Sequence, residues 1–285
     1  MFIDSIKSSP LWEKTRILRR NYNRNNDLKK LSFGDNENEF FLISYPKSGN
    51  TWLRVMLAYA LEADGEREIA FHNIHEYIPD SHIPQQLNEV VHNSEAAFNS
   101  FPVRIIKSHD SYRPYYKRKK VVYILREGKA VINSFYHYIN ARRPKKVETD
   151  VFVKGNTYEV GSWSNHLLGW KNADANVLFV KFEDLKDDPK KEVTRILDYL
   201  GLELTEEKIE EIVAKASFNR MKEFEQKYGY YSDKRTEEGK KVSFVRKGQK
   251  KETSSIFSEE EFKLFEHFNR EAYQAFNYPF THWNA

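Results

Sequence analysis

One segment constrains the fold of this chain more than any other: an apolar run that passes through a glycine turn into a helical pattern. Residues 39–45, EFFLISY, form a short apolar run of the kind that is buried on both faces of a parallel sheet. The turn PKSGN follows, and residues 52–61, WLRVMLAYAL, then show helical apolar spacing. A buried strand that leads through a tight turn into a helix is typical of an α/β protein.

The rest of the chain repeats this alternation of strands and helices. Further buried strands are predicted over 103–108, 121–126 and 176–182. Helical patterns cover 129–141, 158–173, 188–202, 205–216 and 258–276, and the polar stretches 64–100 and 223–245 are expected to be rich in loops. The alternation predicts an α/β fold, a single domain in which helices flank a central parallel sheet.

Composition excludes several functions. Hydrophobic residues make up 40% of the 285, enough for a core, and the absence of cysteine excludes disulfides and cysteine-bound metals. With 46 basic and 42 acidic residues the net charge is only +4, so no nucleic-acid partner is expected. No apolar run approaches the roughly 20 residues that span a bilayer, and the amino terminus lacks a signal peptide. We therefore expect a cytoplasmic protein without a membrane span.

The turn after the first strand has the composition of an anion-binding loop. Gly49 permits a tight turn, the following amides lie at a helix amino end, and Lys47, Ser48 and Thr51 add further donors. It is not the nucleoside-triphosphate loop G-x-x-x-x-G-K-[ST], because Lys47 precedes the glycine. The residues alone are equally compatible with a simple strand-to-helix turn that carries a surface lysine.

Polar residues also follow two other predicted strands. Arg126 ends the 121–126 strand, where ligands gather in α/β sheets, and Ser134 lies eight residues further on. Lys107 and His109 stand at the end of the 103–108 strand, and histidine suits proton transfer near neutral pH. Each of these side chains also has an ordinary structural explanation, as a capping arginine, a surface serine or a packed histidine.

Taken together, these motifs resemble the cytosolic-type sulfotransferase family, whose P-loop-like fold is then expected here. YPKSGNTW is similar to its 5′-phosphosulfate loop, IKSH to the motif of its catalytic histidine, and Arg126 with Ser134 to its 3′-phosphate pair. Later segments match its other motifs in order: GSWSNHLLGW (161–170), FEDLKDDPKKEVTRILDYLG (182–201), SFNRM (217–221) and RKG (246–248). The resemblance covers about 39–278 and implies one domain over 1–285, with 1–38 as an amino-terminal extension.

The resemblance also implies a reaction, a co-substrate and a set of site residues. The reaction is in-line transfer of a sulfuryl group from 3′-phosphoadenosine-5′-phosphosulfate (PAPS) to an acceptor hydroxyl or amine, without a metal. His109 would be the general base, while Lys47 and Lys107 would stabilise charge. The implied PAPS-binding residues are Lys47, Ser48, Gly49, Asn50, Thr51, Trp52, Arg126, Ser134, Phe218, Arg246, Lys247 and Gly248.

The chain departs from the family pattern at several places. Phe182 replaces a tyrosine, Ala216 replaces a threonine, and residues 127–130 alter the turn after Arg126. A degenerate match to the family's dimer motif implies a homodimer through Lys251, Ser255, Ile256 and Glu260. The residues do not identify the acceptor: a small molecule such as a phenol, a lipid alcohol, a glycan and a peptide-bound hydroxyl all stay open. Candidates to line its pocket are Tyr77, His82, Tyr112, Tyr136, Tyr138 and Tyr230.

Two other classes of protein share some of these features. A P-loop kinase has a similar fold and anion cradle, but the lysine position and the lack of a clear magnesium aspartate argue against it. A non-catalytic nucleotide- or polyanion-binding protein would not need His109 beside Lys47, since binding alone does not require the histidine.

Overall fold

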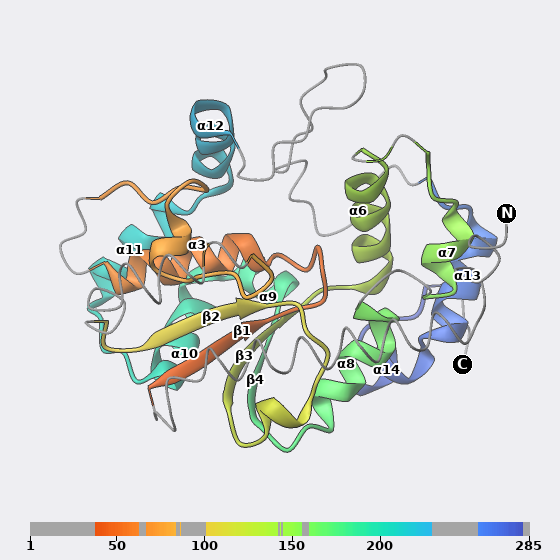
Figure 1. Cartoon of the computed structure of the whole chain (residues 1–285), viewed down its shortest axis with the longest axis horizontal. Helices are drawn as coiled ribbons and strands as arrows, with labels where there is room; N and C mark the ends of the chain where they lie inside the picture. Colours follow the sequence, from red (N-terminus) through yellow and green to blue (C-terminus); the bar gives the residue numbers. More distant parts are fainter. Residues whose placement is uncertain are drawn as a thin grey trace, which may run out of the picture.

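Four parallel strands form the centre of the computed structural model (Figure 1): β1 (Glu39–Ile43), β2 (Arg104–Ser108), β3 (Lys120–Leu125) and β4 (Asn176–Lys181). Their order is β2-β1-β3-β4, and every neighbouring pair is parallel. The structure describes residues 38–62, 67–83, 86, 101–141, 143, 145–155, 160–229 and 256–281. The predicted α/β fold with a central parallel sheet is confirmed, and each strand lies within two residues of its predicted bounds.

The sheet is buried on both faces because alternate side chains of each strand enter different cores. In β1, Phe40 and Leu42 belong to one buried cluster, whereas Phe41 and Ile43 belong to the other. All five residues of β1 are buried, as the continuous apolar run predicted.

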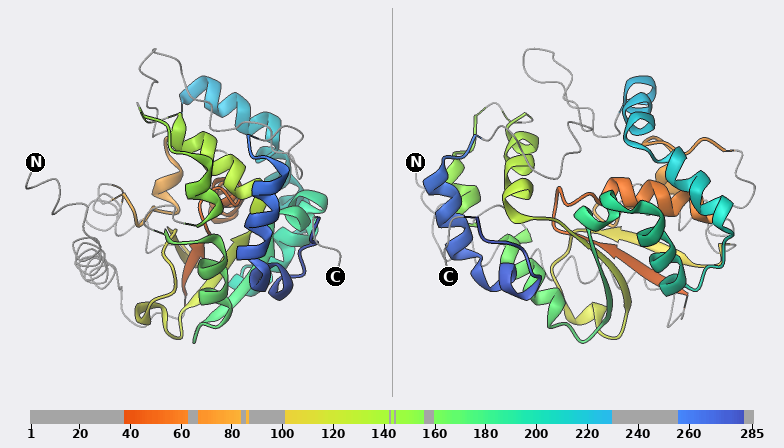
Figure 2. Two further views of the ribbon diagram at one scale, coloured as in Figure 1. Left: turned by 90° about the vertical axis from the view of Figure 1, so that its right-hand side faces the viewer. Right: turned by 180° about the vertical axis from the view of Figure 1, so that it is seen from behind.

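Helices of different parts of the chain cover the two faces (Figure 2). The first cluster includes buried residues of α3 (Asn50–Leu61), α10 (Pro189–Leu200), α11 (Glu206–Lys215) and α12 (Phe218–Tyr228). The second includes α6 (Gly128–Asn140), α7 (Thr149–Val153), α8 (Trp163–Lys171), α13 (Glu259–Phe268) and α14 (Arg270–Ala275). The short elements η1 (Ile74–Glu76), η3 (Pro114–Tyr116) and α9 (Phe182–Asp187) complete the described fold.

Three predictions of local structure were wrong. The helix expected over 258–276 is two helices, because Asn269 separates α13 from α14 and its side chain accepts a hydrogen bond from the amide of Ser164 at 3.2 Å. Phe182, assigned to a strand, begins α9. Helix α12 extends to Tyr228, into the stretch from 223 that was expected to be loop.

Gly49 forms the turn that joins β1 to α3, and only glycine suits this position. Its φ of 97° lies in the left-handed region, and a Cβ atom there would meet Cδ2 of Phe182 at 2.5 Å. The glycine therefore brings the start of α3 close to the start of α9.

We expect Gly49→Ala to destabilise the protein by roughly 2–5 kcal/mol, because the backbone strain and the overlap with Phe182 add. Gly161→Ala is the matched control: its φ is also positive, at 74°, but apart from its chain neighbours no described residue has an atom within 4 Å of the added Cβ. The control should lose only about 1–2 kcal/mol. Urea denaturation of both variants tests this, and equal losses would show that the close approach at Gly49 is unimportant.

Candidate active site

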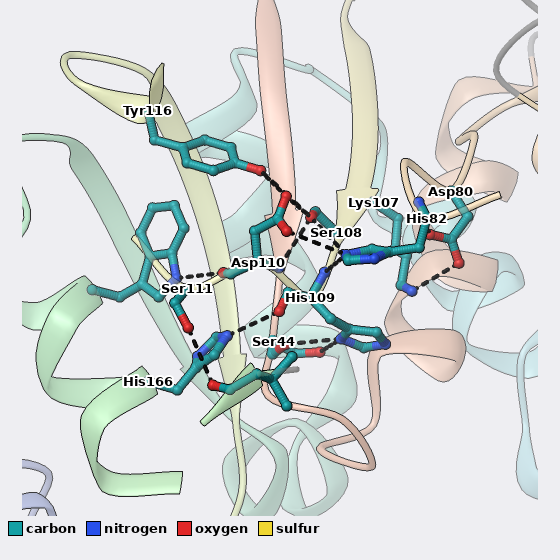
Figure 3. A network of polar contacts seen from close by, with 12 residues as sticks. Ser44, Asp80, His82, Lys107, Ser108, His109, Asp110, Ser111, Tyr116 and His166 are labelled. Carbon is teal, nitrogen blue, oxygen red and sulfur yellow. Dashed lines mark hydrogen bonds and ion pairs between the residues drawn. The ribbon is translucent and has the colours of Figure 1, made fainter. Parts of the chain in front are cut away.

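His109 lies where the first two strands end together. Ile43 pairs with Ser108 in the register of β1 and β2, so Ser44 and His109 leave neighbouring strands at the same edge of the sheet. The Nδ1 atom of His109 lies 2.8 Å from the carbonyl oxygen of Ser44 and 3.1 Å from its Oγ (Figure 3). A carbonyl oxygen only accepts hydrogen bonds, so Nδ1 carries the ring proton and Nε2 keeps its lone pair.

The surroundings of His109 keep its imidazole neutral. Burial, and then the charge of Lys107, hold its pKa well below the ordinary value of 6.5, although Asp80 acts in the opposite direction. Among the described residues none hydrogen-bonds Nε2. A neutral imidazole with an available lone pair can accept a proton from a substrate.

Lys107 is held by a buried ion pair that the sequence did not reveal. Its Nζ lies 2.8 Å from Oδ2 of Asp80, and both side chains are buried. Burial raises the pKa of Asp80, but the charges of Lys107 and then Arg54 outweigh it, so the pKa lies below its ordinary value. Arg54, on α3, is itself buried and donates from Nε to the carbonyl oxygen of Ile78 at 2.8 Å. The charge of Lys107 thus belongs to a cluster rather than to an isolated cation.

Helix α8 holds the backbone of the histidine loop. Nε2 of His166 donates to the carbonyl oxygen of His109 at 3.2 Å, and Nε1 of Trp170 donates to that of Asp110 at 2.9 Å. The two side chains are four residues apart, on one face of α8. Tyr123 donates to Nδ1 of His166 at 2.7 Å, which leaves the proton on Nε2. This explains why the motif at 161–170 carries a histidine and a tryptophan at this spacing.

His82 lies on the other side of the same loop. Its Nε2 accepts the backbone N–H of His109 at 3.1 Å and lies 3.6 Å from Oδ1 of Asp110. Tyr116 and Ser108 donate to Oδ2 of Asp110 at 2.9 and 3.0 Å. Of the six residues suggested as an acceptor-pocket lining, His82 and Tyr138 contact the candidate catalytic residues; the Tyr138 ring lies 4.5 Å from Nζ of Lys47.

The anion loop after β1 has polar groups that suit a phosphate. Lys47 adopts a positive φ of 69°, and the first amides of α3 follow Gly49. The buried Oγ of Ser48 and Oδ1 of Asn50 have no hydrogen-bond partner among the described residues. The buried hydroxyl of Ser48, left in this state at a helix amino end, fits a site that receives a phosphate. Thr51 follows as the second residue of α3.

The structure brings together the residues expected to hold the adenine ring. Nε1 of Trp52 donates to the carbonyl oxygen of Ala216 at 2.7 Å, two residues before Phe218. Phe218 begins α12 with a side chain that is 39% exposed. The loss of the threonine hydroxyl at 216 therefore leaves the main-chain contact to Trp52 in place.

Arg126 and Ser134, the expected 3′-phosphate pair, flank the start of α6. The guanidinium of Arg126 lies 4.6 Å from the ring of Phe182, and its Nη1 lies 3.4 Å from the carbonyl oxygen of Lys47. Ser134 is half-buried in α6, and its hydroxyl makes no hydrogen bond within the described part of the chain. Phe182 thus packs its ring against Arg126, and it lacks the hydroxyl that the tyrosine of the family would have here.

Some predicted site residues lie outside the described ranges: Arg246, Lys247 and Gly248, and also Tyr230, Lys251 and Ser255. Within those ranges, no group of three His, Cys, Asp or Glu side chains is placed to hold a metal ion. None of the helices described is long and apolar enough to cross a membrane.

The sequence did not reveal Asp80 or Ser44 as parts of the site, and it suggested His82 only as a residue that could line the acceptor pocket. Asp80 and His82 lie in the stretch 64–100 that was expected to be loop-rich, and a short bridge beside Lys107 places them there. A parallel bridge of single residues leaves no periodic pattern, and Asp80 is 27 residues from Lys107 in the sequence, so no local signal indicates the ion pair.

An anion loop after one strand and a neutral histidine after its neighbour suit an enzyme that transfers a group from a phosphorylated donor. Residues 37–277 match the sulfotransferase domain family, and the chain belongs to that family. It is 29% identical to flavonol 3-sulfotransferase of Flaveria bidentis over 82% of this chain and 81% of the relative. It is 32% identical to flavonol 4′-sulfotransferase of Flaveria chlorifolia over 70% and 68% of the two chains.

Solved structures show the same fold. Mouse sulfotransferase SULT7A1 complexed with PAP superimposes with a TM-score of 0.61, at 24% identity over 85% of this chain and 86% of the other. Retinol dehydratase in a complex with retinol and PAP gives a TM-score of 0.60, at 20% identity over 87% and 86%. These likenesses confirm the expected sulfotransferase fold.

The buried His166 predicts a specific dependence of stability on pH. Burial lowers its pKa to about 4 in the folded chain, whereas its ordinary value is 6.5. The unfolded state therefore binds the proton more tightly, and His166 should lower the free energy of unfolding by about 3 kcal/mol as the pH falls from 6.5 to 4. Above 6.5 this loss is absent.

We expect His166→Gln to remove this share of the pH dependence, since glutamine does not titrate. Chemical denaturation of both proteins at a series of pH values from 7.5 to 4 measures the difference. Parallel stability curves for the wild type and the variant would contradict the buried neutral state of His166.

Proposed function

We propose that this sulfotransferase moves a sulfuryl group from PAPS to the hydroxyl of a small-molecule acceptor, with His109 as the general base. The observation that carries this assignment is the contact of 2.8 Å between Nδ1 of His109 and the carbonyl oxygen of Ser44. It fixes the ring proton on Nδ1, so the lone pair of Nε2 is available to the acceptor. The family and the names of the relatives support the donor and the acceptor class.

The proton and the bonds balance as follows. The acceptor oxygen forms a bond to sulfur while its proton passes to Nε2 of His109. The bond from sulfur to the bridging phosphate oxygen breaks, and its electron pair stays on adenosine 3′,5′-bisphosphate. Lys47, next to the anion loop, stabilises the charge that develops there.

Lys107 plays a different part from Lys47 in this proposal. Its ammonium pairs with Asp80 at 2.8 Å, so its position is fixed. It acts on the site through the electrostatic field of the buried charges and not by direct contact with the donor. That field also lowers the pKa of His109, which keeps the base unprotonated before the reaction.

The donor nucleotide is held by three groups of residues in this proposal. Ser48, Gly49, Asn50 and Thr51 bind the 5′-phosphate, and the unpartnered buried hydroxyl of Ser48 supports the assignment. Trp52 and Phe218 enclose the adenine, supported by the hydrogen bond of Trp52 to Ala216. Arg126 and Ser134 bind the 3′-phosphate together with Arg246, Lys247 and Gly248, the last three on the resemblance alone.

We expect His109→Ala and His109→Gln to lower the single-turnover rate by roughly 10²–10⁴-fold, the usual contribution of a positioned general base. The affinity for adenosine 3′,5′-bisphosphate should hardly change, because the nucleotide contacts lie on other residues. Rapid-quench assays with labelled PAPS and a panel of phenols and flavonols measure the first quantity, and calorimetry measures the second.

Lys47→Ala is the matched comparison, because it should lower both the rate and the nucleotide affinity. Near wild-type turnover in His109→Ala would disprove the assignment of the base, even in a protein that binds the nucleotide.

We also expect adenosine 3′,5′-bisphosphate to bind at least about tenfold more tightly than adenosine 5′-monophosphate, a difference of about 1.4 kcal/mol. The reason is the separate 3′-phosphate pair of Arg126 and Ser134. Arg126→Gln should abolish most of this preference without a similar loss for the monophosphate. Equal affinities of the wild type for both nucleotides, measured by calorimetry, would exclude this 3′-phosphate site.

A further inference from the structure

A tyrosine near the end of the chain reaches the site expected to hold the 3′-phosphate. The hydroxyl of Tyr278, which follows α14, donates to Oε2 of Glu183 at 3.1 Å. The other carboxylate oxygen, Oε1, accepts the backbone N–H of Glu127 at 3.0 Å. Because Glu127 directly follows Arg126, the carboxylate of Glu183 joins the segment after α14 to the backbone next to this arginine.

The surroundings of Tyr278 keep its hydroxyl a donor. The residue is 6% exposed, its backbone N–H donates to the carbonyl oxygen of Tyr273 at 2.9 Å, and its ring lies 4.8 Å from Nζ of Lys181. Burial, and then the charge of Glu183, raise its pKa above the ordinary value of 10.0. The hydroxyl therefore keeps its proton and fixes the carboxylate that accepts it.

Glu183 lies near Arg126 but binds other groups. The guanidinium of Arg126 lies 4.6 Å from the ring of Phe182, the residue before Glu183. Burial raises the pKa of Glu183, and the charge of Arg126 acts in the opposite direction, so the two charged groups interact. Within the described part of the chain, the carboxylate of Glu183 is bound to Tyr278 and to the backbone of Glu127 rather than to Arg126.

An ion pair between Glu183 and Arg126 would weaken the phosphate site. Carboxylate and phosphate bind arginine in the same way, through two parallel N–H···O hydrogen bonds, so they compete for one guanidinium. A partly buried carboxylate that loses a donor is stabilised by pairing with the nearest cation, because an unpaired charge is costly to bury. The hydroxyl of Tyr278 satisfies Oε2 of Glu183 without the arginine.

We propose that Tyr278 is a positioning residue for donor recognition: it holds the carboxylate of Glu183 away from Arg126 and so leaves this arginine to the 3′-phosphate. Tyr278 acts through Glu183 and not through the reacting atoms. It should therefore affect the selection of a 3′-phosphorylated donor rather than the chemical step. This inference rests on the 3′-phosphate site of the function proposed above.

Tyr278→Phe tests the proposal, because it keeps the buried ring and removes only the hydroxyl. The affinity for adenosine 3′,5′-bisphosphate should fall about three- to tenfold, the effect of one ordinary hydrogen bond, whereas the affinity for adenosine 5′-monophosphate should stay nearly constant. Calorimetry measures both affinities. In steady-state assays the KM for PAPS should rise by a similar factor with little change in kcat, because the variant alters no group near the reacting atoms.

A double variant separates competition by charge from a simple loss of structure. In Tyr278→Phe combined with Glu183→Gln, the amide oxygen can still accept the backbone N–H of Glu127, but the side chain has no charge that pairs with Arg126. The preference for the bisphosphate should therefore return to near the wild-type value. A structural defect caused by the lost hydroxyl would instead persist in the double variant.

Tyr273→Phe is the matched control. Tyr273 is buried on α14, and its hydroxyl donates to Oε1 of Glu127. The carboxylate of Glu127 also accepts the backbone N–H groups of Lys129 and Ala130, at 3.0 and 2.9 Å, so it stays in place without the tyrosine hydroxyl. This variant should lose about as much resistance to urea as Tyr278→Phe and keep the wild-type preference for the bisphosphate.

Two results would overturn the role of Tyr278 alone. One is an unchanged nucleotide preference in Tyr278→Phe, and the other is a double variant that selects the bisphosphate as poorly as Tyr278→Phe does. A wild-type protein that binds both nucleotides equally would instead exclude the 3′-phosphate site, and the role of Tyr278 with it. Measuring the wild-type preference first therefore distinguishes the two failures.

Discussion

The parallel pairing of β1 with β2 is the interaction on which the rest of the site depends. It aligns Ile43 with Ser108, and so it places Ser44 beside His109. The register is set by burial on both faces: a slip of one residue would move Phe40 and Leu42 into the second core and Phe41 into the first. The apolar packing of a five-residue strand thereby determines the position of a polar contact of 2.8 Å beyond its end.

Buried charge close to His109 is the second constraint. Lys107, Asp80 and Arg54 are all buried. Their charges are tolerated in the interior because the negative charge of Asp80 interacts favourably with the positive charges of both Lys107 and Arg54. Loss of Asp80 would leave two uncompensated buried cations, a change of about 3–5 kcal/mol, and would lower the pKa of His109 further. The carboxylate of Asp80 therefore affects both the stability of the fold and the pKa of His109.

Apolar periodicity was sufficient to predict the sheet, because buried strands leave runs such as EFFLISY in the sequence. Periodicity was insufficient where a polar side chain ends a helix. Asn269 separates the last two helices, and its side chain accepts a hydrogen bond from the backbone N–H of Ser164, which is distant in the sequence. The same holds for the site. His109 and Lys47 follow from motifs, whereas Asp80 and Ser44 enter through tertiary pairing that no local pattern encodes.

His109 is held from three sides by groups on different elements. Ser44 after β1 fixes its ring, His82 accepts its backbone N–H, and His166 on α8 donates to its carbonyl oxygen. In the proposed function His109 must lie within hydrogen-bond distance of an acceptor hydroxyl that is aligned with the sulfur, so rigid support of this kind would contribute to the rate. Ser44 also leads into the anion loop, so in the proposed function the segment that binds the donor also orients the base. On that proposal, substitutions between Ser44 and Asn50 are expected to affect donor binding and proton transfer together.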